Sequence, residues 1–250
     1  MIFTNRSRFV LGTALLLSFA SPLVARAEVL LSATDDRPSN KAASAEAHNP
    51  RAVEITFLHG NGERPEDGCA ALREVLKGVG WTHCPRGNLP FGAGFTWGAD
   101  TKSMVDRLTF AEASHLPEGD DAALPRQRLL LAFSQGGYVA PRIVAARPGW
   151  YSSILVIAAT ATYSKATLET LGVRRIGFAA GRWDSTYETM KKNASELARA
   201  GFDARFFDLG PVGHTYLPKN PSELVPIVTW LTESPTAPTT APASTEHAAR

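Results

Sequence analysis

Residues 128–140 read Arg128-Leu-Leu-Leu-Ala-Phe-Ser134-Gln-Gly-Gly-Tyr-Val-Ala140 and carry the strongest indication of the architecture. An apolar run meets a serine, then two glycines, then a segment of helical character, which predicts a strand, a sharp turn and a helix. Such a turn strains the serine backbone and needs small residues two positions before and after it, here Ala132 and Gly136. The familiar pattern is G-x-S-x-G, and alanine replaces its first glycine. The stretch predicts that Ser134 is a presented nucleophile; the alternative is a polar turn residue after a buried strand.

Alternating strands and helices surround this turn. We expect strands at 53–58, 81–84, 128–133, 153–158, 174–180 and 203–209, and helices at 66–77, 101–114, 137–146, 185–200 and 221–231. The alternation predicts an α/β fold with a mostly parallel central sheet covered by helices on both faces. Ligands bind beyond the carboxyl ends of such strands, so the residues after each strand are site candidates. The interval 159–173 is too short for a large lid domain.

The N-terminus has the pattern of a secretory signal peptide. Arg6 and Arg8 precede a mostly apolar run, 9–24, and small residues follow at Ala25 and Ala27. Cleavage after Ala27 predicts an exported protein, periplasmic or secreted, with no stable membrane span. Residues 1–27 hold three arginines and no other charged side chain, so the formal net charge of +2 becomes −1. The alternative is an uncleaved N-terminal anchor.

The composition of the segments that flank the central part of the chain predicts a folded domain at 51–233. Residues 28–50 show no apolar period, and residues 234–250 are rich in Pro, Thr and Ala, so both predict disorder. The basic residues are scattered, and no Lys/Arg block suggests nucleic-acid binding. The sequence does not indicate an oligomeric state.

The chain has two cysteines, Cys69 and Cys84. An even count in an oxidising compartment favours a disulfide, which would join the start of a helix to the end of the next strand. The alternative is two free buried thiols. Two cysteines without a nearby histidine pair make a poor metal site, and we expect neither a metal nor an organic cofactor.

Three further loops after predicted strands carry reactive residue types. His59-Gly60-Asn61-Gly62 can aim a backbone N–H at a developing oxyanion beside the N–H of Gln135; Asn61 is our choice, with Gly60 and Gly62 as alternatives. Asp184 follows the strand at 174–180; it suits an acid that orients a histidine, or a helix N-cap. Asp208 is the rival acid. His214 follows the last strand in a glycine-containing loop.

Together these loops predict a Ser134–His214–Asp184 triad for acyl transfer. A serine hydroxyl is a weak nucleophile and needs an adjacent base, and a histidine can take its proton and return it to the leaving group. The aspartate fixes the imidazole tautomer and stabilises its cation. Backbone donors stabilise the tetrahedral intermediate by roughly 3–4 kcal/mol each.

The same segments make the sequence resemble an α/β-hydrolase, most of all the small carboxylesterase/phospholipase family that includes the acyl-protein thioesterases. The matching segments are 58–62, 133–137, 181–184 and 213–214, in the same order along about 52–232. The resemblance implies a serine hydrolase of carboxylic esters or thioesters, without metal or cofactor, whose partner is a small-molecule or lipid-like ester. A peptidase or acyltransferase of the same fold is the first alternative, and a non-catalytic binding domain is the second.

Aromatic residues near the predicted site suggest where a substrate binds. We expect three in the loop 85–98 to wall an acyl or aromatic pocket and two near the acid to line its rim: Phe91, Phe95, Trp97, Trp183 and Tyr187. The alternative for each is packing in the core under a long loop.

Overall fold

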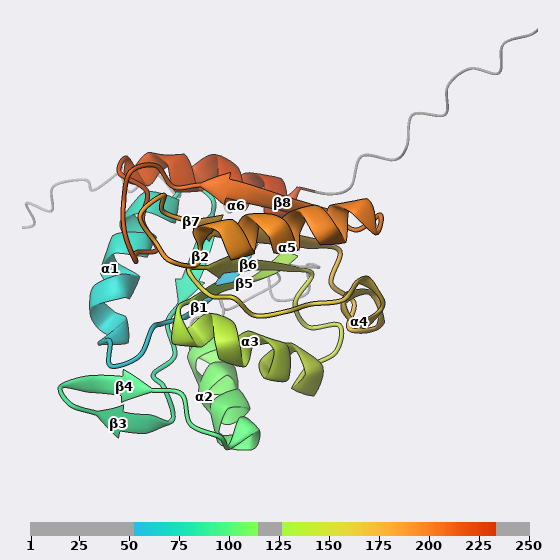
Figure 1. Cartoon of the computed structure of the whole chain (residues 1–250). Helices are drawn as coiled ribbons and strands as arrows, with labels where there is room; N and C mark the ends of the chain where they lie inside the picture. Colours follow the sequence, from blue (N-terminus) through green and yellow to red (C-terminus); the bar gives the residue numbers. More distant parts are fainter. Residues whose placement is uncertain (1–52, 115–126, 234–250) are drawn as a thin grey trace, which may run out of the picture. The chain divides into compact units, whose positions relative to one another are not determined.

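Six parallel strands form the central sheet of the computed structural model, which describes residues 53–114 and 127–233. The expected signal peptide, lead-in and tail at 1–27, 28–50 and 234–250 lie outside the described residues. Neighbouring strands of the sheet follow the order β2-β1-β5-β6-β7-β8, and each pair is parallel (Figure 1). The strands are β1 (Val53–Leu58), β2 (Gly80–His83), β5 (Gln127–Phe133), β6 (Ser153–Ile157), β7 (Arg175–Ala180) and β8 (Asp203–Asp208).

The inner strands are apolar because both faces of the sheet are covered. In β5, Leu129, Leu131 and Phe133 join the core on one face, while Leu130 and Ala132 join the core on the other. Continuous apolar runs of this kind are typical of parallel sheets with helices on both sides. The α/β prediction is therefore confirmed.

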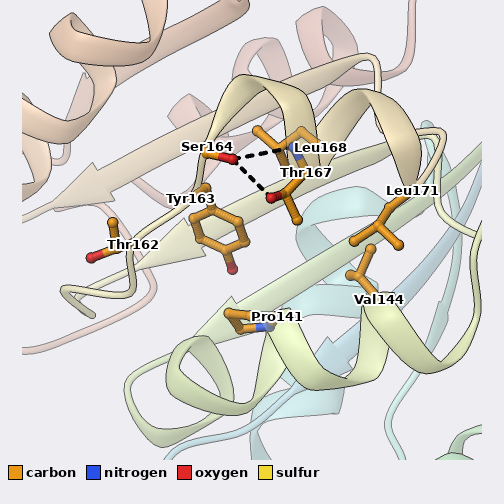
Figure 2. Close-up of a pocket in the computed structure, with 8 residues that line it drawn as sticks. All are labelled: Pro141, Val144, Thr162, Tyr163, Ser164, Thr167, Leu168 and Leu171. Carbon is orange, nitrogen blue, oxygen red and sulfur yellow. Dashed lines mark hydrogen bonds between the residues drawn. The ribbon is translucent and has the colours of Figure 1, made fainter.

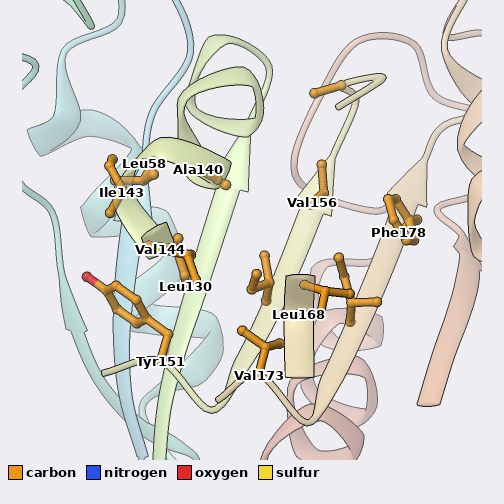
Figure 3. Close-up of a cluster of buried hydrophobic side chains, with 14 of the residues drawn as sticks. Leu58, Leu130, Ala140, Ile143, Val144, Tyr151, Val156, Leu168, Val173 and Phe178 are labelled. Atoms are coloured by element: carbon orange, nitrogen blue, oxygen red, sulfur yellow. The ribbon is translucent and has the colours of Figure 1, made fainter. Parts of the chain in front are cut away.

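The helices form two layers around this sheet (Figure 1). Helices α1 (Pro65–Leu76) and α6 (Leu224–Thr232) contribute to one core, and a 3₁₀ turn, Pro221–Glu223, precedes α6. The second core receives α2 (Thr101–Ala113), α3 (Gln135–Ala146), α4 (Lys165–Thr170) and α5 (Tyr187–Arg199). Figure 3 shows side chains from α3 and α4 packed with β5, β6 and β7 in this second core. Within the described ranges, no helix is long and apolar enough to cross a membrane.

Strand register brings the functional loops to one edge. Leu58 pairs with Ala132, Phe133 pairs with Ile157, and the last residues of β7 and β8, Ala180 and Asp208, pair with each other. The carboxyl ends of these strands are therefore level, and the segments that follow β1, β5, β7 and β8 emerge side by side.

A β-hairpin and one short helix were not predicted from the sequence. A hairpin of β3 (Leu89–Phe91) and β4 (Gly94–Thr96) lies in the expected loop 85–98, and α4 lies in the interval 159–173. These strands are too short and too rich in Gly and Pro for a clear alternation. The hairpin is instead held from outside, because Gly62 N–H donates to the Phe95 carbonyl and Phe95 N–H donates to the Glu63 carbonyl, both at 2.9 Å.

Cys69 and Cys84 form the predicted disulfide, with Cα atoms 5.8 Å apart. Cys69 lies in α1, and Cys84 directly follows β2 at the edge of the sheet. The bond therefore fastens α1 to the edge strand at the point where the chain enters the segment 85–98.

A buried carboxylate joins α2 to the sheet and to α3. One oxygen of Glu112 accepts from Thr56 Oγ1 at 2.7 Å and from the Tyr151 hydroxyl at 2.8 Å. Its other oxygen accepts from Arg147 Nη2 at 2.7 Å and Trp150 Nε1 at 3.2 Å. Every donor compensates for the desolvation of this charge, so loss of the carboxylate would leave the buried Arg147 cation unpaired.

Removing the disulfide by the double substitution Cys69→Ser/Cys84→Ser is expected to lower the free energy of unfolding by about 3 kcal/mol. The bond closes a loop of sequence separation 15, and the chain-entropy model gives that magnitude for such a loop. Urea unfolding under non-reducing conditions measures the change. Equal stability of variant and wild type would contradict the prediction.

Glu112→Ala is expected to lower the free energy of unfolding by about 3–5 kcal/mol, because it leaves a buried guanidinium without its partner. The matched control is Glu169→Ala, which removes an exposed i,i+4 partner of Lys165 and should cost less than about 1 kcal/mol. Urea unfolding of both variants checks the pair, and similar losses in the two would refute the assignment.

Candidate active site

Ser134 lies in a strained turn between β5 and α3. Its backbone has φ 51° and ψ −117°, a region that costs a non-glycine residue about 1–3 kcal/mol. The Ser134 N–H donates to the Ile157 carbonyl at 2.9 Å, which ties the turn to β6. A Cβ on Gly136 would lie 2.2 Å from the Leu58 carbonyl oxygen, so only glycine fits there. The turn therefore has the geometry predicted from the sequence.

A continuous hydrogen-bond chain joins Ser134, His214 and Asp184. The Ser134 Oγ lies 2.8 Å from His214 Nε2, and His214 Nδ1 lies 2.7 Å from Asp184 Oδ2. The three residues follow β5, β8 and β7, at the carboxyl edge of the sheet. With Nδ1 donating to the carboxylate, Nε2 is left to accept the serine proton.

The second oxygen of Asp184 is held by one residue, Thr186. Both its backbone N–H and its hydroxyl donate to Asp184 Oδ1 at 2.8 Å. Burial alone would raise the pKa of Asp184, whose side chain is 1% exposed, but the bonds from Thr186 and His214 outweigh burial and lower that pKa. The carboxylate is thus ionised and fixed in orientation.

Asp208 has other partners. Its carboxylate accepts from Arg182 Nε at 2.7 Å and from the Gly210 N–H at 2.8 Å. Of the two acids that the sequence offered, the structure therefore brings Asp184 to His214.

Of the three candidate backbone N–H donors in the loop after β1, those of Gly60, Asn61 and Gly62, two already have acceptors. Gly60 N–H donates to the Glu63 carboxylate, and Gly62 N–H donates to the Phe95 carbonyl, each at 2.9 Å. Among the described residues, no hydrogen bond occupies the N–H of Asn61 or that of Gln135. Of the candidates in this loop, Asn61 is thus the one whose N–H remains available to a ligand.

His59 is a structural residue in the same loop. Burial lowers the pKa of its ring. The neutral ring accepts from the Gly87 N–H at Nε2 (2.9 Å) and donates from Nδ1 to the Gly60 carbonyl (2.7 Å). These bonds fasten the loop to the segment 85–98.

The predicted aromatic wall is wrong for Trp97. Its side chain is 4% exposed, its ring packs against His59 at 4.9 Å between centroids, and its Nε1 donates to the His59 carbonyl at 2.9 Å. Trp97 is therefore a core residue, because the segment 85–98 folds back onto the sheet. Phe95 lies under the Arg86 guanidinium, and Tyr187 packs edge-on against Phe206, 5.0 Å between centroids.

Phe91 and Trp183 are exposed in segments near the carboxyl edge of the sheet. Phe91 is 54% exposed, and its ring lies 3.1 Å from where a Cβ on Gly62 would be. Trp183 is 74% exposed and directly precedes Asp184. Both leave apolar surface open to a ligand.

Sequence reasoning missed two site residues, Thr186 and Thr96. Thr186 holds Asp184, and its position shortly after an acid at a helix start is the sequence signal that was available. The Thr96 hydroxyl contacts the side chains of Asn61 and Gln135 across 35 and 39 residues of chain. No local pattern indicates contacts of that separation.

A separate pocket of about 280 Å³ lies between α3 and α4 (Figure 2). No charged side chain is among its lining residues, which are Pro141, Val144, Thr162, Tyr163, Ser164, Thr167, Leu168 and Leu171. The Ser164 Oγ caps α4 by accepting from Thr167 N–H, and burial raises the pKa of the Tyr163 hydroxyl. The pocket therefore contains no activated nucleophile or base. Within 53–114 and 127–233, no group of three or more His, Cys, Asp or Glu is arranged to hold a metal ion.

Comparison with known proteins defines the fold. No protein-family model and no curated protein matches the sequence. Among solved structures, the chain is similar to an uncharacterized protein from Bacillus cereus, with a TM-score of 0.57 and 12% identity over 83% of this chain. The chain spans 63% of the length of that protein.

Two further solved structures are similar over most of their own length. The protein Atu2452 from Agrobacterium tumefaciens, of unknown function, has a TM-score of 0.50 and 16% identity, with 73% of this chain and 92% of that chain covered. A variant of SOBER1 from Arabidopsis thaliana has a TM-score of 0.52 and 17% identity, with 73% and 100% covered. Together with the strand order and the strained serine turn, these likenesses show that the chain has the α/β-hydrolase fold.

Proposed function

We propose that the protein is a serine hydrolase that cleaves carboxylic esters or thioesters through an acyl-enzyme on Ser134. The observation that carries the proposal is the hydrogen-bond chain from Ser134 Oγ through His214 to Asp184, at 2.8 and 2.7 Å. Contacts of this length are those that general-base activation of a serine requires. We assign the chain to the family of small carboxylesterases/phospholipases, because its motifs after β1, β5, β7 and β8 resemble those of that family.

The reaction has two steps with the same residues. His214 Nε2 takes the Ser134 proton as Oγ attacks the ester carbonyl, and the resulting oxyanion accepts hydrogen bonds from the N–H groups of Asn61 and Gln135. His214 then returns the proton to the leaving alcohol or thiol, which leaves an acyl-serine. His214 then deprotonates a water molecule, which attacks the acyl-serine; the carboxylic acid is released as His214 returns that proton to Ser134 Oγ. Asp184 stabilises the imidazolium in both steps.

The exposed aromatic side chains beside the serine support an apolar substrate group. Phe91 lies against Gly62 in the loop that carries Asn61, and Trp183 directly precedes Asp184. We assign them to the acyl or aryl part of a small-molecule or lipid-like ester. Phe95 and Tyr187, whose rings pack against Arg86 and Phe206, are weaker candidates for that contact. The signal-peptide pattern at 1–27 supports export, to the periplasm or outside the cell.

Ser134→Ala is expected to lower kcat/KM for a soluble p-nitrophenyl ester by at least about 10³-fold, because the nucleophile is lost. Ser195→Ala, which removes an exposed hydroxyl bonded to the Lys191 carbonyl on α5, is the matched control and should keep wild-type activity. Steady-state kinetics with an oxygen ester, a thioester and an anilide of the same acyl group rank the three substrate classes. Full esterase activity of Ser134→Ala would refute the proposed nucleophile.

Asp184→Asn is expected to lower kcat by about 10⁴-fold, because an amide stabilises the wrong imidazole tautomer. Asp208→Asn is the control acid, and its kcat should stay within about threefold of wild type because its partner is Arg182. The same ester assay measures both. The assignment of the acid fails if Asp208→Asn gives the larger loss.

A further inference from the structure

The Thr96 hydroxyl lies between the side chains of the two residues that supply the proposed oxyanion donors. Its Oγ1 is 2.7 Å from Asn61 Oδ1 and 2.8 Å from Gln135 Oε1. Asn61 lies in the loop after β1 and Gln135 follows Ser134, so these two segments are far apart in the sequence. One hydroxyl on β4 therefore joins both halves of the oxyanion site.

The available donors and acceptors determine which group donates in each hydrogen bond of Thr96. The Gln135 amide pairs with the backbone of Trp97, because Oε1 accepts the Trp97 N–H at 3.0 Å and Nε2 donates to the Trp97 carbonyl at 3.3 Å. A threonine hydroxyl has one hydrogen and also accepts. All groups are satisfied when Thr96 donates to Gln135 Oε1 and the Asn61 amide is turned to donate to Thr96 Oγ1, an orientation equivalent in shape.

The strand that carries Thr96 is itself anchored to both segments. The Gly62 N–H and the Glu63 carbonyl bond to Phe95, next to Thr96, at 2.9 Å each. Arg142 on α3 donates to the carbonyls of Gly98 and Ala99, just after β4, at 3.2 and 3.1 Å. β4 is therefore a rigid connection between the loop after β1 and the helix that begins at the serine.

We infer that Thr96 is a positioning residue that sets the separation of the Asn61 and Gln135 N–H groups. The inference rests on the proposed function. An oxyanion donor acts only when it lies about 2.7–3.1 Å from the developing negative oxygen. A small displacement of one donor therefore reduces the stabilisation of the transition state. The two N–H groups bind the tetrahedral intermediate more strongly than they bind the substrate carbonyl. Displacing one of them therefore lowers kcat more than it changes KM.

The test is the isosteric variant Thr96→Val, which keeps the β-branched shape and removes the hydroxyl. We expect kcat for the soluble p-nitrophenyl ester to fall about 10- to 100-fold, less than the loss of a whole donor, with KM within about threefold. Thr96→Ser should recover most of the kcat. The control Thr170→Val removes a hydroxyl that bonds to the Ala166 carbonyl on α4, and it should keep wild-type kcat.

Binding of a tetrahedral-intermediate mimic separates positioning from general loosening of the fold. The Kd of a trifluoromethyl ketone, which forms an anionic adduct with the serine, should rise in Thr96→Val by the same factor as kcat/KM falls. Asn61→Ala keeps its backbone N–H but loses the contact to Thr96, so it should lower kcat in the same way. Because both substitutions break one junction, the double variant should lose little more than either single variant.

Wild-type kcat in Thr96→Val, or additive losses in the double variant, would overturn the inference. Either result with Ser134→Ala inactive would leave the proposed function intact and reject the role of Thr96 alone. If Thr96→Val does not fold, the kcat of Asn61→Ala and its partial recovery in Asn61→Ser decide the question; wild-type kcat in Asn61→Ala would overturn the inference.

Discussion

The close approach of α3 to the end of β1 is the constraint on which the site depends. Gly136 passes so near the Leu58 carbonyl that no side chain fits, and this forces the chain to turn sharply at Ser134. The turn places Ser134 at the carboxyl end of β5, directly before the first residue of α3. Since β1 and β5 are paired in register, the loop after β1 emerges beside the serine. The strand pairing thus places the loop after β1 next to Ser134, and the close contact between the two segments admits only glycine at position 136.

Hydrogen bonds from neighbouring residues hold the other parts of the site in place. Thr186 fixes the acid, His59 fastens the loop after β1, and Thr96 joins that loop to the start of α3. The segment 85–98 is central to this arrangement, and the Cys69–Cys84 disulfide closes immediately before it. We interpret that segment as the frame of the proposed oxyanion site, and its exposed apolar side chains, Phe91 among them, remain open to a substrate.

Much of the sheet was predictable, and so was the convergence of the three residues proposed for the triad, because both follow from local patterns and one topological rule. Apolar runs such as 128–133 identify strands, and residues after parallel strands converge on one edge whatever the loops contain. The choice between Asp184 and Asp208 was harder, since one follows β7 and the other ends the neighbouring strand β8; it depended on which of the two reaches His214. The hairpin β3–β4 was missed because its strands are held by Gly62 and Glu63 rather than by their own pattern. Trp97 was also misplaced, because no local pattern shows whether an aromatic residue in a predicted loop packs inward, as Trp97 does against His59.

The central claim is that Ser134 is an activated nucleophile, and a fluorophosphonate probe tests it most directly. The probe forms a covalent bond only with a serine whose proton a neighbouring base removes. Intact-mass analysis of the full chain should show a single adduct on wild type, mapped by peptide sequencing to Ser134, and none on Ser134→Ala. An unmodified wild type, or an adduct that persists on Ser134→Ala, would contradict the account.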